Sequence, residues 1–386
     1  MTTPRRLRYA MIGGGPGAMI GPIHRFAARL DDRWELIAGA LSSDAQRAAE
    51  GAEQCRIAPD RSYADWQSMI AAEAARTDDR IDAVVIVTPN HLHAAPAIAA
   101  LDAGFHVICD KPLASSIEEA QAMAQAVERS GRAFVVTYTY SAFPMVRHMR
   151  AMVAAGVLGD LRIIQSQYAQ DWLASSLEQD GNKQAAWRTD PARSGAGGAL
   201  GDIGTHAYQL AHFVTGLDAE ALCADLASFG PGRTLDDNAH LMLRYPGGVR
   251  GMMWATQVAP GKGNQLRIGI YGSEAGVEWD QEHPEQLRFT RIGQPTAILE
   301  RGNDLLNIGG YTTRLPPSHP EGYLEGFAQL YSDAADLILA QDAGDTEKVA
   351  ASLLPGIADG LDGMRFINGA IASQKAGTWL AREDWA

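Results

Sequence analysis

The chain has 386 residues, of which 46% are hydrophobic and 20% are charged. This composition excludes a disordered protein, and the length is sufficient for two domains of ordinary size. With 46 acidic against 33 basic residues the formal net charge is -13, which argues against nucleic acid and anionic membrane surfaces as partners because both would be repelled.

The three cysteines indicate a reducing compartment. Cys55, Cys109 and Cys223 are odd in number and far apart, without the spacing of a disulfide framework or of a metal site. The first residues lead into a strand pattern rather than into the apolar segment of a signal peptide, and no apolar run reaches the ~18 residues of a membrane span. We therefore expect a cytoplasmic protein that holds no metal ion.

Short apolar runs alternate with amphipathic stretches in the first third of the chain. This alternation is typical of βαβ units that build a parallel sheet. The expected strands cover residues 7–12, 34–41, 83–87, 105–109 and 133–137, and the expected helices cover 22–30, 44–55, 63–76, 92–103 and 116–130. The pattern predicts an α/β domain over residues 1–138.

The pattern changes in the remainder of the chain. A helix is expected over 145–155, a strand over 161–169, a long loop rich in Trp, Gln, Arg and Gly, a helix over 199–214, and strands over 238–245, 248–258, 265–271 and 276–280. Turns of hairpin length such as Tyr245-Pro246-Gly247-Gly248 join these strands, and helices over 322–340 and 346–375 follow. We expect a second domain over 139–386, of α+β class with an antiparallel sheet.

A glycine-rich turn follows the first expected strand and reads Gly13-Gly14-Gly15-Pro16-Gly17-Ala18. Glycines permit a tight turn and let the backbone approach a pyrophosphate, whose charge is met by the N-terminal amides of the next helix. Because the turn opens an alternating α/β segment, it favours a Rossmann domain that binds a dinucleotide; a turn without a ligand is the alternative. The turn is longer than the simplest fingerprint, so Gly21 rather than Ala18 is expected at the close helix-packing position.

The end of the second expected strand bears on which dinucleotide binds. The chain reads Ala40-Leu41-Ser42-Ser43 where a carboxylate for the ribose hydroxyls of NAD normally stands. Asp44 lies one residue further and can take that role, whereas Ser42, Ser43 and Arg47 can receive the 2′-phosphate of NADP. These residues leave NAD and NADP open.

Two other strands of the expected parallel sheet end in short polar motifs. One ends in Thr88-Pro89-Asn90 and the next in Cys109-Asp110-Lys111-Pro112. Ligands of doubly wound sheets bind at the carboxyl ends of the strands, and Pro112 disfavours a helical conformation at Lys111. Lys111 is therefore expected beside the cofactor, with a surface lysine before a turn as the alternative.

A carboxylate and an imidazole share the helix expected over 199–214. Asp202 and His206 are four residues apart, so they project from one helical face. Glycines at 195, 197, 198, 201 and 204 surround them, which costs helix stability and is tolerated where backbone or ligand must approach closely. A histidine that is satisfied in the core is the alternative interpretation of His206.

Together these motifs resemble the Gfo/Idh/MocA oxidoreductases over essentially the full chain. The resemblance rests on residues 13–21, Thr88-Pro89-Asn90 with His93, Asp110-Lys111-Pro112 and Gly201-Asp202-x-Gly204-x-His206. Asp110 replaces the more common glutamate before the lysine, a change of small consequence because Lys111 carries the chemistry. The resemblance implies a nicotinamide-binding Rossmann domain, a second domain with a large, mostly antiparallel sheet, and a homotetramer.

The resemblance also implies roles for single residues. The catalytic triad is Lys111, Asp202 and His206. The cofactor is expected to contact Gly13, Gly15, Pro16, Gly17, Ala18, Ser42, Ser43, Arg47, Thr88, Pro89, Asn90, His93, Asp110 and Lys111. The inositol and sugar dehydrogenase branch is the most similar, and it implies oxidation of a polyol such as scyllo-inositol or L-glucose with NAD.

Sugar hydroxyls need many hydrogen-bond partners and often an aromatic face, so specificity is expected in the polar, Trp-bearing loop. Besides the triad, the expected substrate contacts are Tyr140, Asp171, Trp172, Gln184, Trp187, Arg188, Thr205 and His319. Burial of Trp and Tyr as apolar anchors of the loop is the alternative.

The expected reaction is a hydride transfer with acid–base assistance. His206 removes the proton of a secondary hydroxyl, since an imidazole with a reference pKa of about 6.5 is a base near neutral pH. Lys111 stabilises the developing alkoxide, and Asp202 orients Lys111 or His206. An NAD-dependent glycosidase that oxidises its substrate transiently is one alternative, and a nicotinamide-sensing regulator is a second.

Overall fold

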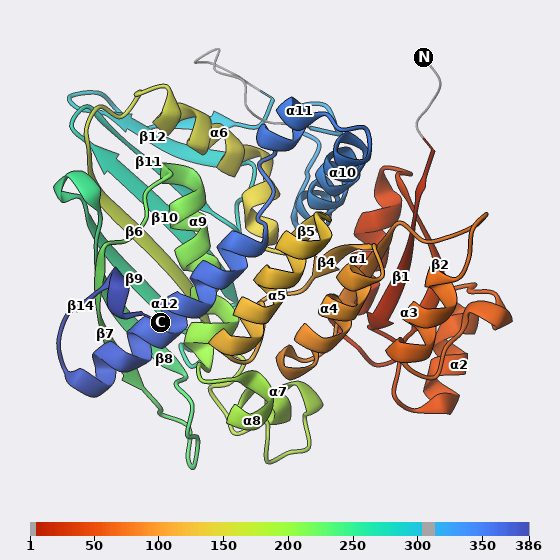
Figure 1. The fold of residues 1–386 in the computed structure, drawn as a ribbon. Helices are drawn as coiled ribbons and strands as arrows, with labels where there is room; N and C mark the ends of the chain where they lie inside the picture. The colour runs from red at the N-terminus through yellow and green to blue at the C-terminus, as the bar shows by residue number, and fades with distance from the viewer. Residues whose placement is uncertain (1–4, 303–312, 386) are drawn as a thin grey trace. The chain divides into compact units, whose positions relative to one another are not determined.

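The computed structural model describes residues 5–302 and 313–385 (Figure 1). The chain divides into two compact units. Unit 1 comprises Met1–Ala114, Glu118–Thr139 and Leu324–Leu361, and unit 2 comprises Ser115–Ile117, Tyr140–Tyr323 and Asp362–Ala386.

Unit 1 is built on a parallel sheet of five strands in the order β2-β1-β3-β4-β5. The strands are β1 Leu7–Gly13, β2 Trp34–Ala40, β3 Ala83–Val87, β4 His106–Cys109 and β5 Phe134–Val136. The helices are α1 Ile20–Leu30, α2 Ala45–Gln54, α3 Trp66–Ala74, α4 Ala94–Asp102, α5 Ile117–Ser130, α10 Tyr323–Asp342 and α11 Thr346–Ala350. The order reverses between β1 and β3, and this switch point is where doubly wound sheets bind their ligands.

The segment Leu324–Leu361 belongs to unit 1, which corrects the prediction that residues 139–386 form one domain. Tyr331 of α10 packs edge-on against Trp34 of β2 and accepts the indole N–H in its backbone carbonyl at 2.8 Å. The Tyr331 hydroxyl lies 2.8 Å from Nδ1 of His24 on α1, and burial lowers the pKa of His24 to about 4. An amphipathic pattern predicts a helix, but it does not specify the sheet on which the helix packs.

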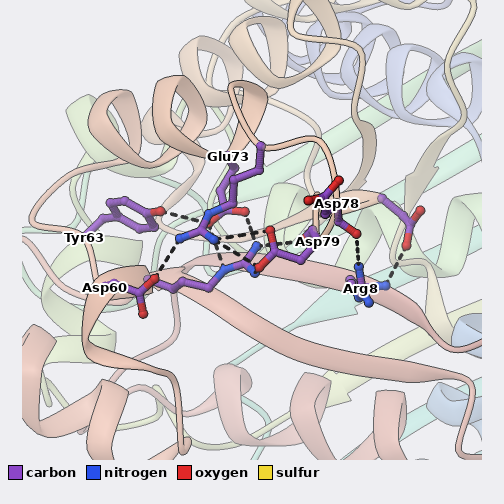
Figure 2. Close-up of polar contacts among 9 residues, drawn as sticks. Arg8, Asp60, Tyr63, Glu73, Asp78 and Asp79 are labelled. Atoms are coloured by element: carbon purple, nitrogen blue, oxygen red, sulfur yellow. Dashed lines mark hydrogen bonds and ion pairs between the residues drawn. The ribbon is translucent and has the colours of Figure 1, made fainter.

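An ion-pair cluster ties the chain before α3 to the end of that helix (Figure 2). Arg61 pairs with Glu73 and, at 2.7 Å, with Asp79. The Tyr63 hydroxyl donates to Glu73 at 2.8 Å, and burial together with this bond raises the pKa of Tyr63 to about 12. The Glu73 side chain is 0% exposed and that of Arg61 is 7% exposed, so both charges depend on their partners.

Unit 2 is built on a nine-stranded sheet in the order β13-β12-β11-β10-β6-β9-β8-β7-β14. The strands are β6 Leu161–Gln170, β7 Ala221–Ala227, β8 Asn238–Arg244, β9 Arg250–Thr256, β10 Asn264–Gly272, β11 Ala275–Asp280, β12 Gln286–Arg291, β13 Ala297–Glu300 and β14 Leu380–Ala381. The helices are α6 Pro144–Ala154, α7 Lys183–Arg188, α8 Pro191–Ser194, a π-helical turn Leu200–Gly204, α9 Thr205–Thr215 and α12 Ile357–Ala376. Within the ladders β6 and β9 are parallel and the other pairs are antiparallel.

Strand alternation gives this sheet one covered and one open face. Helix α9 packs on β6, β9 and β10, and α6 packs on β11 and β12 (Figure 1). Ile164, Ser166 and Tyr168 of β6 are buried beneath these helices, whereas Ile163 on the opposite face is exposed. On β6, the side chains at 164, 166 and 168 therefore lie on the face of the sheet that the helices cover.

The helix predicted over 346–375 is divided into α11 and α12. Pro355 lies between them, lacks a backbone N–H, and its carbonyl instead accepts the N–H of Val136 at 2.9 Å. The short strands β12, β13 and β14 were not predicted individually, because two to six residues carry little periodicity. In the part of the chain that the structure describes, no helix combines the length and the apolar character needed to cross a membrane.

Candidate active site

The glycine turn after β1 is packed so closely that larger residues would not fit. A Cβ on Gly15 would lie 2.6 Å from the carbonyl oxygen of Leu41, to which the Gly15 N–H bonds at 3.1 Å. A Cβ on Gly21 would overlap the backbone of Gly14. Gly21 therefore holds the close packing position between α1 and the turn, as the length of the turn predicted.

The same turn fits the pyrophosphate of a dinucleotide. Gly13 and Gly17 have φ values of 77° and 81°, which glycine adopts without strain. A Cβ on Gly17 would meet nothing within 4 Å, so the outer side of the turn is open. Helix α1 begins at Ile20, directly after the turn, and helix N-termini attract anions. Pro16 and Ala18 complete the turn, and the Ala18 N–H bonds to the Gly15 carbonyl at 3.0 Å.

The loop after β2 is exposed, and its polar groups bond to one another. The Asp44 carboxylate caps α2 by accepting the Arg47 N–H at 2.9 Å, and the Ser42 hydroxyl accepts the Asp44 N–H at 3.1 Å. Ser43 and the Arg47 side chain are exposed. Asp44 is thus already used as a helix cap, and the hydroxyls and guanidinium that suit a 2′-phosphate stand beside it.

His93 holds the motif after β3 in place through hydrogen bonds to backbone carbonyls. The His93 ring is 0% exposed, and its Nε2 lies 2.8 Å from the Thr88 carbonyl. Its Nδ1 lies 3.1 Å from the Pro112 carbonyl. Both ring nitrogens are thus used by backbone carbonyls, and the contact of His93 with the cofactor stays a prediction. Its bonds connect the loop of Thr88, Pro89 and Asn90 to the loop that follows Lys111.

The motif after β4 places Asp110 in a structural role beside Lys111. Asp110 Oδ1 accepts the Thr137 hydroxyl at 2.6 Å and the Lys111 N–H at 3.0 Å. These bonds fix the end of β4 against the end of β5, and the Lys111–Pro112 peptide bond is cis. Lys111 is half-buried at the carboxyl edge of the parallel sheet, the edge to which the sequence assigned it.

Asp202 and His206 of unit 2 lie where a π-helical turn passes into α9. Asp202 is within the turn, and His206 is the second residue of α9. The uniform α-helix expected over 199–214 is thereby corrected. π-Helical turns inside helices occur frequently at functional sites.

The start of this helical segment is held by Asp236. Its two carboxylate oxygens accept the N–H groups of Gly198 and Leu200, each at 2.7 Å. Burial raises the pKa of Asp236, and these two bonds lower it. A Cβ on Gly198 would overlap the Asp236 carbonyl, which explains why a glycine stands at this position.

Arg188 and Gln257 both bond to the carboxylate of Asp202. Arg188 Nε donates to Oδ2 at 3.1 Å, and Gln257 Nε2 donates to the same oxygen at 2.8 Å. The Arg188 and Asp202 side chains are 15% and 14% exposed, so water screens this ion pair less than it screens a surface pair. The sequence singled out Arg188 only as an expected substrate contact, and it missed Gln257.

Three predicted substrate contacts surround the Arg188 guanidinium. It lies 4.3 Å from the ring centre of Trp187 and 5.8 Å from that of Trp172. It also donates to Gln184 Oε1 at 2.6 Å, and this oxygen accepts the Trp187 indole N–H at 3.2 Å. Arg188 and its partners therefore form one polar and aromatic cluster beside Asp202.

The imidazole of His206 packs against two tyrosines. Its ring centre lies 5.0 Å from that of Tyr140 and 6.0 Å from that of Tyr168. The Tyr140 and Tyr168 hydroxyls are 2.6 Å apart, and burial raises the pKa of both. Tyr140 is 4% exposed, so in this structure it contacts the catalytic candidate rather than solvent.

Three predicted substrate contacts have other surroundings. The Thr205 side chain is buried and donates to the Gly201 carbonyl at 2.9 Å, and its contact with substrate stays a prediction. Asp171 accepts the Gly261 N–H at 3.1 Å. His319 lies in an exposed turn with Nδ1 3.2 Å from the Pro317 carbonyl.

The residues that sequence reasoning missed in unit 2 are amides at strand ends. They are Gln170, Gln257 and Asn264, and Gln257 bonds to Asp202 directly. The signal was their position at the ends of predicted strands, but pairing of β6 with β9 is not readable from one sequence. Within residues 5–302 and 313–385, no group of three or more His, Cys, Asp or Glu side chains could hold a metal ion.

Two family models match most of the chain. Residues 7–138 match the model described as an oxidoreductase family with an NAD-binding Rossmann fold. Residues 146–278 match the model of the GFO/IDH/MocA C-terminal domain.

Solved structures and sequence relatives agree with these matches. The inositol dehydrogenase homolog from Azotobacter vinelandii complexed with NAD+ has a TM-score of 0.94 and 36% identity, and the match covers 98% of this chain and 97% of that chain. Its complex with NADH and myo-inositol has a TM-score of 0.91 and 35% identity, and covers 98% of each chain. Levoglucosan dehydrogenase from Pseudarthrobacter phenanthrenivorans is 29% identical over 418 residues, which cover 99% of this chain and 98% of that protein.

The glycine turn fits a dinucleotide, and the family model that matches residues 7–138 describes an NAD-binding fold. The C-terminal match covers the segment that carries Asp202 and His206. The chain therefore belongs to the GFO/IDH/MocA family of NAD-binding oxidoreductases.

Proposed function

We propose that the protein is a dehydrogenase that oxidises a secondary hydroxyl of a cyclic polyol or sugar to a ketone. The observation that carries this proposal is the cluster of Arg188, Gln184, Trp172 and Trp187 beside Asp202. Polyols present many hydroxyls together with an apolar ring face, and polar groups interleaved with indoles suit both. The similarity to an inositol dehydrogenase homolog and to levoglucosan dehydrogenase supports the same substrate class.

In the proposed mechanism His206 is the general base. Its imidazole removes the proton of the substrate hydroxyl, and the tyrosines against its ring fix the ring plane. Lys111 donates a hydrogen bond to the same oxygen and stabilises the negative charge that develops on it. Asp202 orients Lys111 or His206. Bound NAD supplies the hydride acceptor.

The cofactor would be held by unit 1 through the glycine turn, the loop after β2 and the ends of β3 and β4. We propose NAD rather than NADP as the preferred cofactor, in keeping with the NAD+ and NADH complexes of the Azotobacter homolog. Ser42, Ser43 and Arg47 leave room for NADP as a weaker alternative.

The test is a panel of substrates assayed by the appearance of NADH. Inositols, aldoses including L-glucose, levoglucosan and glucosides are offered with NAD and with NADP, and glycerol serves as an open-chain control. We expect net NADH formation with a cyclic polyol or sugar, and a kcat/KM about 10- to 100-fold above that for glycerol, because unpaired polar groups disfavour the poorer ligand.

Two outcomes of the same panel would contradict the proposal. Release of an alcohol from a glycoside without net NADH identifies a glycosidase that oxidises its substrate transiently. Tight NAD binding with no turnover of any member identifies a nicotinamide-sensing protein.

We also propose a homotetramer, for which the open face of the unit 2 sheet offers an interface. Ile163, Met242 and Met252 on this face are 50%, 52% and 54% exposed, and Met252 lies directly opposite Met242 in the ladder. A two-fold axis through such a face would cover the same apolar row on both copies. The cytoplasmic location stays a prediction of the sequence.

Light scattering after size-exclusion chromatography tests the assembly. The unmodified protein is expected at four times the mass of the chain, and Met252→Glu is expected to lower the mass because it places a charge in the interface. Ile292→Glu, at an exposed residue in a turn, should leave the mass unchanged. A monomeric unmodified protein contradicts the proposal.

A further inference from the structure

Three side-chain amides meet at one edge of the unit 2 sheet. Gln170 is the last residue of β6, Gln257 follows β9 directly, and Asn264 is the first residue of β10. Because β6 runs parallel to β9 and antiparallel to β10, these positions lie at the same edge. Gln170 and Gln257 lie two residues beyond Tyr168 and Ala255, so their side chains are on the same face of the sheet as those two buried residues. We call Gln170, Gln257 and Asn264 the amide array.

Gln170 is the hub of the array. Its Oε1 accepts the Trp172 indole N–H at 3.0 Å and Gln257 Nε2 at 3.4 Å. Its Nε2 donates to Asn264 Oδ1 at 2.6 Å. Gln257, which is 2% exposed, gives its other N–H to Asp202 Oδ2 at 2.8 Å.

Asn264 connects the array to the two tyrosines that pack against His206. Asn264 Oδ1 also accepts the Tyr168 hydroxyl at 2.8 Å, so Tyr168 uses its single proton there. The hydrogen bond of 2.6 Å between the two tyrosines must then be donated by Tyr140. Both rings pack against the imidazole of His206. One chain of hydrogen bonds thus joins the carboxylate of Asp202 to the aromatic surroundings of His206.

Each amide in the chain has one permitted orientation. An indole N–H can only donate, and an ionised carboxylate can only accept. Trp172 therefore requires the oxygen of Gln170 to face it, and Asp202 requires the nitrogen of Gln257 to face it. These two requirements fix the orientation of every amide in the chain, because a reversed amide would place two donors or two acceptors opposite each other.

We propose that the amide array is a positioning device that fixes the Asp202 carboxylate and the His206 imidazole relative to one another, with Gln257 as the positioning residue for Asp202. This inference rests on the proposed function of these two side chains. Misplacement of a catalytic group by about 1 Å can cost about 100-fold in rate. Gln257 approaches Asp202 from the end of β9, whereas Arg188 approaches it from the end of the short helix α7.

The first test compares Gln257→Leu with Gln265→Leu. Gln257→Leu keeps the size of the side chain and removes both hydrogen bonds, so kcat is expected to fall about 10- to 100-fold. Gln265 is also buried, on the same strand as Asn264, but it bonds Gln167 and Lys262 outside the array. Gln265→Leu is expected to lower the melting temperature about as much as Gln257→Leu does, but to retain kcat. Both variants are expected to bind NADH, followed by fluorescence, with unchanged affinity.

The second test uses Gln257→Glu and the pH profile. The carboxyl group that this change introduces can, when protonated, donate to Asp202 as the amide does, but two ionised carboxylates at this distance repel each other. Like charge raises the apparent pKa of the pair above the ordinary value of about 4.3 for a glutamate. The proton is present below that pKa and is lost as the pH rises through it. Arg188 faces Asp202 as a partner in an ion pair, and burial raises the pKa values of the two tyrosines beside the array.

The decisive quantity is the ratio of variant kcat to unmodified kcat at each pH, compared between Gln257→Glu and Gln257→Leu. For Gln257→Glu this ratio is expected to rise by up to about tenfold per pH unit as the pH falls toward the pair's pKa, while for Gln257→Leu it stays flat. Unchanged kcat in Gln257→Leu, or a flat ratio in Gln257→Glu, overturns the inference. If the unmodified protein oxidises no polyol, it is the proposed function that fails.

Discussion

Replacing His206 with asparagine is expected to lower kcat at least about 100-fold, and up to about 10,000-fold, without a comparable change in NADH affinity. General-base catalysis contributes this range, and an amide cannot accept the hydroxyl proton at neutral pH. Asparagine retains a polar group of similar size against Tyr140 and Tyr168, so the loss is not caused by a cavity. Stopped-flow measurement of the first turnover, beside NADH fluorescence titration, separates the chemical step from cofactor binding.

Lys111→Met tests the catalytic candidate of unit 1. Removing a cation that stabilises developing alkoxide is expected to cost about 100- to 1,000-fold in kcat. His212→Asn is the control for the histidine, because His212 lies on the same helix and pairs with Asp218 near the surface. Wild-type turnover in both His206→Asn and Lys111→Met would show that the catalytic assignment is wrong.

The second large effect concerns the stability of unit 1. Glu73→Ala is expected to lower the free energy of unfolding by about 3–5 kcal/mol, because it leaves the buried Arg61 guanidinium without its main partner. Arg61→Ala is expected to cost a similar amount, since the Glu73 carboxylate is then buried beside only Tyr63 and the more distant Arg76 among the groups of this cluster. The cluster in Figure 2 thus links two charges whose separate removal is costly.

Urea unfolding of the single and double variants tests this pairing. Arg61→Met combined with Glu73→Leu removes both charges and fills the space with apolar groups, so it is expected to cost far less than either single change. Asp32→Asn, which removes the exposed ion pair with Arg6, should leave the unfolding midpoint nearly unchanged. A double variant as unstable as the sum of the single variants would contradict the account.

Residues 7–137 were predictable because local patterns are sufficient there. Apolar runs such as 83–87 become wholly buried parallel strands, and such strands read as continuous hydrophobic segments. The glycine turn was recognisable because the steric requirement falls on consecutive residues. Its extra length even identified Gly21 as the packing residue, a conclusion that needs only the spacing of turn and helix.

His93 and Thr205 show what motif reasoning leaves open. Both stand inside recognisable motifs, yet both are buried and bond to backbone carbonyls. A motif records which residues occur together, and it does not separate a side chain that touches a ligand from one that holds the ligand-binding loop. That distinction depends on burial, which is a property of the packed chain.

The sequence by itself determined the parallel sheet of unit 1, the dinucleotide turn and the identity of Lys111, Asp202 and His206 as candidates, because each follows from neighbouring residues. Only the tertiary structure decided that residues 324–361 pack on the first sheet and that Gln170, Gln257 and Asn264 meet beside Asp202. The physical reason is that these contacts join segments tens to hundreds of residues apart. Their pairing is selected by packing and by hydrogen-bond satisfaction across the whole sheet, to which no local pattern responds.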